Sequence, residues 1–292
     1  MKRIVISGAS GFVGSNLSNF LSQHGYLVDK LSRSDLGVSD NELSDRLNGA
    51  NAVINLAGAP INQRWTQTYK EVLYTSRVKT TQKIANAIRL AAVKPEVFIS
   101  TSAVGIYKNQ TRNTERAAQY DIGYLAKICK DWEASALTTL KITRTVIFRL
   151  AVVLGRDGGA LKNMLPIFKM GLGGPLGSGK QGFPWIHLDD LLQAYLFVLE
   201  HPEAEGIYNL TAPEIVTNKE FTNTLAAVVK RPAVMSVPIF TLKLLYGQGA
   251  VALTEGAFVE PFRLQEAGFQ FKYPRLAGAL KQILHKEIPV LQ

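Results

Sequence analysis

The sequence predicts an α/β fold, with a doubly wound parallel sheet followed by a smaller α-rich lobe that would bind a substrate. Three observations carry this prediction. Strand-like apolar segments alternate with helical segments in the first half, a glycine-rich turn follows the first strand, and Gly and Pro become frequent after residue 153. We therefore expect a nucleotide-binding domain over residues 1–153, which later segments could rejoin, and a substrate lobe with the C-terminal region over residues 154–292.

The first half of the chain has the pattern of strands joined by crossover helices. The predicted strands are residues 3–7, 27–32, 51–56, 97–101 and 145–150, and the predicted helices are residues 12–24, 68–92 and 122–140. After residue 153 the predicted elements are a Gly- and Pro-rich stretch over 171–184, a helix over 191–200, a strand over 206–210 and a helix opened by a capping box from Thr217 to Glu220.

The composition indicates a globular chain in a reducing compartment. Hydrophobic residues make up 47% of the 292 residues, yet no apolar run approaches the roughly 18 residues of a membrane span. The chain opens on Met1, Lys2, Arg3 and a strand-like segment rather than a signal peptide, and Cys129 is its single cysteine. We expect a cytoplasmic protein that binds no membrane.

The charge favours a small anionic ligand over nucleic acid. Lysine and arginine number 33 against 23 acidic residues, a net charge of +10, but they are scattered and form no basic stripe with interleaved aromatic residues. A phosphate-bearing cofactor fits this charge better than nucleic acid does. The four histidines lie far apart in the sequence, so we expect no metal site.

The turn after the first strand carries the strongest motif. The residues GASGFVG place Gly8, Gly11 and Gly14 between the first strand and the first helix. In this context the first glycine permits a tight turn, the second lets the backbone approach a pyrophosphate, and the third allows close packing of helix and strand. The motif predicts a Rossmann-type domain that binds a dinucleotide at the N-terminus of the first helix.

The end of the second strand indicates which dinucleotide. An NAD-binding protein places an acid there against the ribose hydroxyls, whereas this chain has Arg33 followed by Ser34. A guanidinium suits a 2′-phosphate, so the predicted cofactor is NADP(H). Asp29 is a weaker alternative inside the strand, and Arg33 could simply be a surface charge. At the third strand end, the small residues of Leu56-Ala57-Gly58 leave room for the cofactor.

A second glycine-rich stretch, GGPLGSGKQGFPWIHLDD over residues 173–190, resembles a phosphate-binding P-loop but lacks its chemistry. Gln181 replaces the Ser or Thr that binds magnesium, and Gly182-Phe183-Pro184 prevents a helix from starting at once. We expect a loop of the substrate lobe at the mouth of a cleft, with Asp189 or Asp190 capping the next helix. The candidate substrate contacts, with core packing as the alternative, are Lys180, Gln181, Trp185 and His187.

Blocks along nearly the whole chain, from residue 8 to residue 274, resemble one superfamily. They include GASGFVG, NLAGAPI, SRVKTT, STSAVGIY, WEASA, RLAVVLGRDGGAL, YNLTAPEIVTN and AGFQFKYP. The chain resembles the extended short-chain dehydrogenases/reductases, and more closely their atypical "epimerase family protein" group. The resemblance implies an NADP(H) domain beneath a substrate lobe, in a monomer or in a homodimer formed through the two long helices.

The resemblance also implies particular cofactor contacts. It places Gly8, Gly11, Phe12, Val13 and Gly14 at the pyrophosphate, Arg33 and Ser34 at the 2′-phosphate, Leu56, Ala57 and Gly58 on the adenosine side, Arg77 with Glu71 as a possible partner, and Ser100 with the 150–152 backbone, including Val152, near the nicotinamide.

The catalytic residues of the superfamily are only partly present. Its chemistry uses a serine with a YxxxK pair, in which lysine lowers the pKa of the tyrosine. Ser102 fits the serine, but aligning Glu133 with the usual glutamate puts Leu125 in the tyrosine position and Cys129 in the lysine position. The candidates to replace the pair in proton transfer are Tyr107, Tyr124, Cys129 and His187.

Two functions therefore remain open at the level of sequence. One is an NADP(H)-dependent oxidoreductase or epimerase that acts on a small, possibly nucleotide-linked, substrate. The other is a non-catalytic NADP(H)-binding protein that reports the state of the cofactor to a partner. The cofactor motif supports both, while Ser102 favours the first and the missing Tyr-Lys pair the second.

Overall fold

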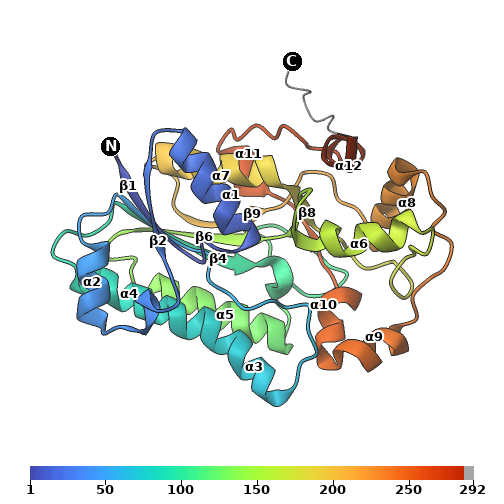
Figure 1. Cartoon of the computed structure of the whole chain (residues 1–292), viewed down its shortest axis with the longest axis horizontal. Coiled ribbons are helices and arrows are strands. Elements are labelled where there is room, and N and C mark those ends of the chain that lie inside the picture. The colour runs from blue at the N-terminus through green and yellow to red at the C-terminus, as the bar shows by residue number, and fades with distance from the viewer. Residues whose placement is uncertain (286–292) are drawn as a thin grey trace.

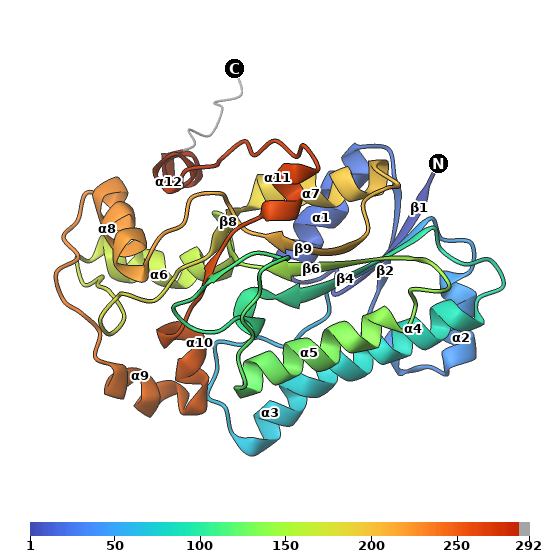
Figure 2. The same cartoon turned by 180° about the vertical axis from the view of Figure 1, so that it is seen from behind.

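The computed structural model describes residues 1–285, and its framework is a six-stranded parallel sheet (Figures 1 and 2). The strands lie in the order β2-β1-β3-β4-β6-β9, so the direction of winding reverses between β1 and β3. Their bounds are β1 Arg3–Ser7, β2 Leu27–Leu31, β3 Ala52–Asn55, β4 Val97–Ala103, β6 Arg144–Leu150 and β9 Gly206–Leu210. Ligands of such sheets bind at the carboxyl ends of the strands, beside the point of reversal.

Helices cover both faces of the sheet, which confirms the doubly wound fold predicted from the sequence. On one face lie α1 (Phe12–Gln23) and α7 (Leu188–Glu200), and on the other lie α2 (Asp40–Leu47), α4 (Thr80–Leu90) and α5 (Tyr124–Leu137) (Figure 1). Successive strand residues point to opposite faces. In β4, for example, Ile99 packs with the first group and Phe98 with the second.

Most element boundaries differ from the predicted ones by one to three residues, and three differences bear on the site or the packing around it. The predicted helix over 68–92 is divided into α3 (Gln67–Tyr74), a π-helical turn (Thr75–Lys79) and α4. The predicted strand over 97–101 continues to Ala103, because β6 pairs with it along that length. The predicted helix at 191 begins at Leu188 instead.

The last strand of the sheet, β9, comes from far along the chain. It pairs in parallel with β6, and α7, just before it, packs on the sheet through its buried apolar residues. The remaining elements form the C-terminal lobe and the small sheets beside it. These are β5 Arg112–Asn113, β7 Val152–Leu154, α6 Gly159–Lys169, β8 Trp185–His187, α8 Asn218–Val229, α9 Ile239–Tyr246, α10 Val251–Thr254, β10 Phe258–Val259, α11 Phe262–Glu266 and α12 Leu276–His285.

The lobe has its own core and confirms one predicted helix start. Apolar residues of α6, α8 and α12 pack around Trp185. The predicted capping box opens α8, because the Thr217 hydroxyl accepts from the Glu220 backbone N–H at 3.2 Å while the Glu220 carboxylate accepts from the Thr217 N–H at 2.7 Å.

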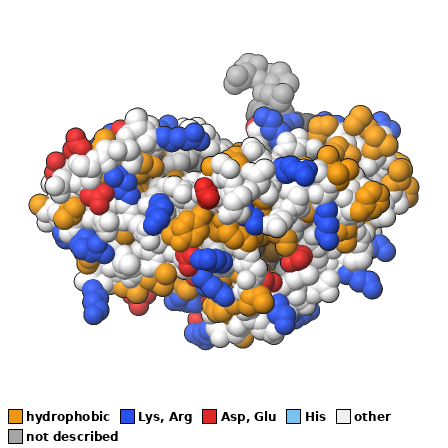
Figure 3. Space-filling model, turned by 90° about the horizontal axis from the view of Figure 1, so that it is seen from below, with side chains coloured by type: hydrophobic (Ala, Val, Ile, Leu, Met, Phe, Trp, Pro, Cys, Tyr) orange, Lys and Arg blue, Asp and Glu red, His pale blue; other side chains and the backbone are white. Residues whose placement is uncertain are grey.

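Exposed apolar side chains gather around α9. Phe240, Leu244 and Leu245 are exposed there, and the corresponding end of the molecule is rich in hydrophobic side chains in Figure 3. The solvent side of α5, one of the two long helices, carries the ion pair Lys127–Asp131. Among the helices of residues 1–285, none has the length and apolar character needed to cross a membrane.

Candidate active site

The turn between β1 and α1 is a cradle that only glycine allows. Gly8 has φ +73°, and a Cβ there would lie 2.7 Å from the backbone of Leu56. A Cβ on Gly14 would lie 2.2 Å from the carbonyl oxygen of Gly8, so α1 presses directly on the turn. Backbone groups and the N-terminus of α1 thus form an open surface at the sheet's carboxyl edge, which fits the pyrophosphate of a dinucleotide.

Phe12 has a further task that the sequence did not reveal. Its ring packs against the turn that precedes α6, where a Cβ on Gly158 would lie 2.1 Å from the ring. A Cβ on Gly155 would lie 2.6 Å from the same ring, and one on Gly159 would lie 3.1 Å from it. The glycines of the LGRDGG segment therefore make room for Phe12, and the side chain of Phe12 is committed to packing rather than to a cofactor.

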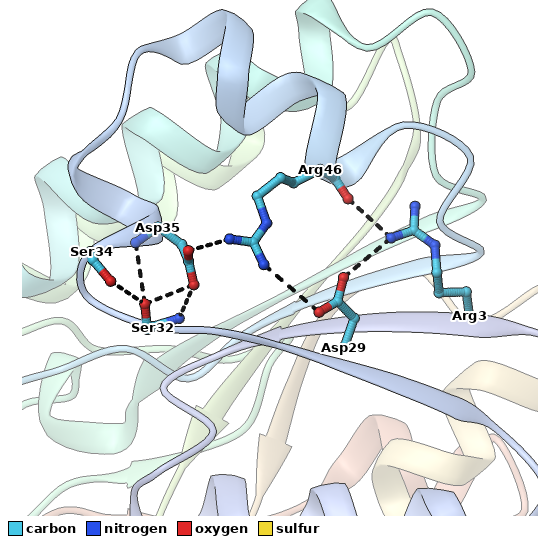
Figure 4. Close-up of polar contacts among 6 residues, drawn as sticks. All are labelled: Arg3, Asp29, Ser32, Ser34, Asp35 and Arg46. Carbon is cyan, nitrogen blue, oxygen red and sulfur yellow. Dashed lines mark hydrogen bonds and ion pairs between the residues drawn. The ribbon is translucent and has the colours of Figure 1, made fainter.

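In the middle of β2, Asp29 is already paired. Its carboxylate contacts Arg3 at 3.4 Å and Arg46 at 4.0 Å (Figure 4). Both partners hold the Asp29 carboxylate on the side of the strand that faces α2. Asp29 is therefore poorly placed to bind the ribose of a cofactor, the role that the sequence left open for it.

The turn that follows β2 is ordered by Ser32. Its hydroxyl contacts the Ser34 hydroxyl and donates to Asp35 Oδ2, both at 2.7 Å, and Asp35 also pairs with Arg46 (Figure 4). Hydrogen bonds from Ser32 lower the pKa of Asp35. Arg33 projects from this turn with its side chain exposed and makes no hydrogen bond or ion pair within residues 1–285.

The loop after β3 is fixed by a buried polar group that sequence reasoning missed. Asn55 Oδ1 accepts from Ser7 at 2.6 Å and from the backbone N–H of Ala57 at 3.2 Å, while its amide donates to Thr81 at 2.7 Å. An asparagine in an otherwise apolar strand was the available signal, since a buried amide needs partners.

Ser76 and Arg77 also hold the loop after β3 in place. Ser76 accepts from the Ala59 N–H at 3.0 Å, and Arg77 donates to the Ala59 carbonyl at 2.9 Å and to the Leu73 carbonyl at 3.3 Å. These carbonyls take the place of Glu71, the expected partner of Arg77, because Glu71 lies exposed on α3. The SRVKTT segment is thus a clamp on the loop after β3.

A cavity of about 200 Å³ opens at the carboxyl ends of β3 and β4. It brings together the predicted adenosine-side residues and Ser102, which are far apart in the sequence. Leu125 and Cys129, one helical turn apart on α5, also face it. The lining consists of Leu56, Ala57, Gly58, Ile61, Leu73, Arg77, Thr101, Ser102, Ala103, Leu125, Ile128, Cys129 and Trp132.

Ser102 is joined to a buried ionic network. Its hydroxyl donates to Glu133 Oε1 at 2.7 Å, and Glu133 accepts two hydrogen bonds from Arg149, at 2.8 and 2.7 Å. Arg149 also donates to the Tyr107 hydroxyl at 2.8 Å, which donates to Asn209 at 2.7 Å. Burial favours a lower pKa for Arg149, but the hydrogen bonds and charge of Glu133 outweigh it and raise that pKa. Arg149 within an apolar strand was the signal for this network.

Two of the expected substitutes for the Tyr-Lys pair lie outside the cavity. Tyr107 is held between Arg149 and Asn209, and burial raises its pKa to about 12. Tyr124 donates to the carbonyl oxygen of Lys70 at 2.7 Å, at the start of α5. Neither hydroxyl lines the cavity with Ser102. The sequence could not show this, because the register of α5 turns Leu125 rather than Tyr124 inward.

Cys129 does line the cavity, but its thiol is in a poor environment for reactivity. Burial raises the pKa of Cys129 to about 12, with the charge of Glu133 adding to the effect. We expect the native protein to react slowly with Ellman's reagent at pH 8 and to release its thiol rapidly in guanidinium chloride. Fast labelling of the folded protein would contradict this placement.

His187, expected as a substrate contact or proton donor, is a structural residue. Its Nδ1 accepts from the Asp189 N–H at 3.0 Å and so caps α7, while Nε2 lies 2.9 Å from Gln282 Oε1 and the ring stacks on Tyr273. Burial lowers its pKa. The expected cap from Asp189 or Asp190 is therefore wrong, and Asp190 instead accepts from the backbone N–H groups of residues 272 and 273.

The other residues of the second glycine stretch lie away from the cavity. Trp185 is buried in the core of the lobe, Gln181 donates to the Leu176 carbonyl at 3.1 Å, and Lys180 is exposed. A Cβ on Gly174 would lie 1.6 Å from the carbonyl oxygen of Met235. The glycines here permit contact between two backbone segments, which explains the likeness to a phosphate-binding loop.

Ser100 and Val152, which were expected near the nicotinamide, both lie within strands. Ser100 is buried in β4, and its hydroxyl has no hydrogen-bond partner within residues 1–285. The Val152 N–H donates to the Pro184 carbonyl at 3.1 Å, where β7 meets β8. Ser100 is therefore not open to a ligand, and the backbone N–H of Val152 is already engaged.

Comparison with known proteins identifies related families and individual relatives. The profile of the NAD dependent epimerase/dehydratase family matches residues 4–211, and a domain of unknown function, DUF1731, matches residues 237–283. The chloroplastic homolog of epimerase family protein SDR39U1 from Arabidopsis thaliana is 38% identical over 96% of this chain and 86% of its own length. Mouse SDR39U1 is 36% identical over 97% of this chain and 99% of its own.

Solved structures agree as well. Human epimerase family protein SDR39U1 (isoform 2), crystallised with NADPH, has a TM-score of 0.91 at 35% identity and covers 98% of this chain and 100% of its own. UDP-glucuronic acid 4-epimerase from Bacillus cereus, in complex with NAD, shares the fold, with a TM-score of 0.76 at 16% identity over 98% of this chain and 99% of its own. The chain belongs to the NAD dependent epimerase/dehydratase family, among the epimerase family proteins related to SDR39U1.

Proposed function

We propose that the protein is an NADP(H)-dependent oxidoreductase or epimerase that acts on a small molecule. One observation carries the proposal: Ser102 opens into a cavity whose wall includes the loop after β3, beside the glycine cradle of the first turn. Cofactor and substrate could therefore meet at the carboxyl edge of the sheet. The NADPH in the crystal of human SDR39U1 supports the choice of cofactor.

The residues of this chain fit the cofactor by type and by position. We propose that it is held by Gly8, Gly11, Phe12, Val13 and Gly14 through their backbones, by Arg33 and Ser34 at the 2′-phosphate, and by Leu56, Ala57 and Gly58 on the adenosine side. When bound, its nicotinamide donates or accepts a hydride. Ser102 would then turn its hydroxyl from Glu133 to a substrate oxygen and orient it.

The cofactor preference depends on Arg33. We expect Arg33→Ala to weaken NADPH binding by about 10- to 100-fold, because it removes charge-assisted hydrogen bonds to the 2′-phosphate. NADH binding should hardly change. Fluorescence titration of both cofactors measures this, and Lys30→Ala, on the preceding strand, is the control. Equal affinity of the wild-type protein for NADPH and NADH would contradict the assignment.

Turnover is tested through Ser102. We propose that Ser102→Ala abolishes NADPH oxidation against a panel of carbonyl compounds and nucleotide sugars while NADPH affinity is kept. The alternative is a non-catalytic sensor of NADP(H), which Leu125 and Cys129 favour because neither side chain replaces a tyrosine and lysine in proton transfer. Tight NADPH binding without oxidation on any member of the panel would favour the sensor.

The compartment and the assembly remain proposals. We propose a cytoplasmic protein, consistent with the free, buried Cys129, in the form of a monomer or homodimer. Light scattering after gel filtration distinguishes the two forms.

A further inference from the structure

Arg77 brings a positive charge to the wall of the cavity. It lies on the π-helical turn between α3 and α4, and such turns occur often at functional sites. Its guanidinium lies against Gly58, since a Cβ on that glycine would be 3.2 Å from Arg77 Cζ. The same Cζ lies 5.6 Å from the ring centroid of Trp132. It lines the same cavity as Ser102, and of the residues 1–285 that line this cavity it alone is charged.

Among the described residues, this charge has no acidic partner. Within residues 1–285 no carboxylate lies within 4.0 Å of Arg77, and its hydrogen bonds go to two backbone carbonyls. Glu133, the buried acid nearby in the site, is paired with Arg149 instead. Burial lowers the pKa of Arg77. A guanidinium has more N–H donors than these carbonyls use, and a partly buried cation is stabilised when an anion joins it.

The rest of the cavity is apolar. Apart from Arg77 and the hydroxyls of Thr101 and Ser102, the side chains that line it are hydrocarbon, aromatic or thiol. The thiol of Cys129 is protonated at neutral pH, because burial raises its pKa to about 12. A sugar would leave many of its hydroxyls without partners against such walls, at a cost in binding.

We infer that Arg77 is an anion-binding residue of the substrate cavity, and that the substrate is a small organic acid with an apolar body rather than a nucleotide-linked sugar. The anionic group pairs with Arg77, and the apolar body packs against Leu125, Ile128 and Trp132. This inference rests on the proposed function, since it places the substrate in the same cavity as Ser102. It assigns Arg77 to substrate binding, whereas the family resemblance implied a contact with the cofactor.

The test uses the NADPH-loaded protein and two matched probes, phenylpyruvate and its neutral methyl ester. Calorimetric titration should show phenylpyruvate binding at least about 10-fold more tightly than the ester. Arg77→Gln should weaken phenylpyruvate by about 10- to 100-fold and leave the ester unchanged. Arg77→Lys, which keeps the charge but not the planar fork, should give an intermediate loss.

Lys79→Gln is the control, because it removes an exposed cation from the same π-helical turn and should leave both probes unaffected. Thermal melts check that each variant is folded, and the comparison of acid with ester in the wild-type protein needs no variant. The inference is overturned if acid and ester bind equally, if neither binds, or if Arg77→Gln weakens NADPH as much as phenylpyruvate. Failure of the wild-type protein to bind NADPH at all would instead contradict the proposed function.

Discussion

Replacing Arg149 with methionine is expected to lower the free energy of unfolding by about 3–5 kcal/mol. Within the described part of the chain, the substitution leaves the charged, buried Glu133 with the Ser102 hydroxyl as its single side-chain partner, and it removes the donor to Tyr107. The loss of stability comes mainly from leaving the Glu133 carboxylate buried without a cationic partner, rather than from losing the attraction between Glu133 and Arg149. Chemical denaturation followed by circular dichroism measures the change.

A matched control lies on α5, the helix that carries Glu133. Lys127 and Asp131 form an exposed ion pair on α5, and Lys127→Met should change stability little because water screens that pair. The double variant Arg149→Met with Glu133→Leu should recover much of the loss, since it removes both charges. If Arg149→Met and Lys127→Met are equally mild, the buried network does not stabilise the protein as the geometry implies.

Gly14→Ala is expected to weaken NADPH binding by about 10- to 100-fold and to destabilise the fold by about 1–3 kcal/mol. The new methyl group would meet the Gly8 carbonyl oxygen at 2.2 Å, and both are backbone-bound, so α1 must move away from the turn. That movement shifts the N–H groups that would face the pyrophosphate. Fluorescence titration with NADPH and thermal denaturation measure the two effects.

Gly37→Ala controls for the substitution itself, because nothing lies within 4 Å of a Cβ at that position and its φ is ordinary. It should leave both NADPH affinity and stability nearly unchanged. Wild-type NADPH affinity in Gly14→Ala would mean that the first turn of α1 is not the cofactor's site.

The sequence predicted what depends on local pattern. Apolar segments located the strands, and GASGFVG located the glycine turn between β1 and α1, because both are set by residues that are neighbours in the chain. The alignment on Glu133 placed Leu125 and Cys129 in the tyrosine and lysine positions of the superfamily motif, and both side chains line the same cavity as Ser102.

What the sequence could not provide depends on contacts between distant residues. The pairing of Glu133 with Arg149 joins α5 to β6, and the cap of α7 comes from a histidine, whereas that of α8 comes from the threonine of a capping box. His187 was a reasonable candidate ligand because an exposed imidazole in a loop is one. Its burial under Tyr273 and Gln282 could be known only from the fold.

The place of β9 in the sheet has a consequence for biosynthesis. Because β9 supplies the sixth strand, the edge of β6 has no partner until residue 210 has left the ribosome. A nascent chain ending near residue 153 would expose both that edge and the apolar face that α7 later covers. Chaperone demand during translation should therefore peak between the emergence of β6 and that of β9, well before the C-terminal lobe is complete.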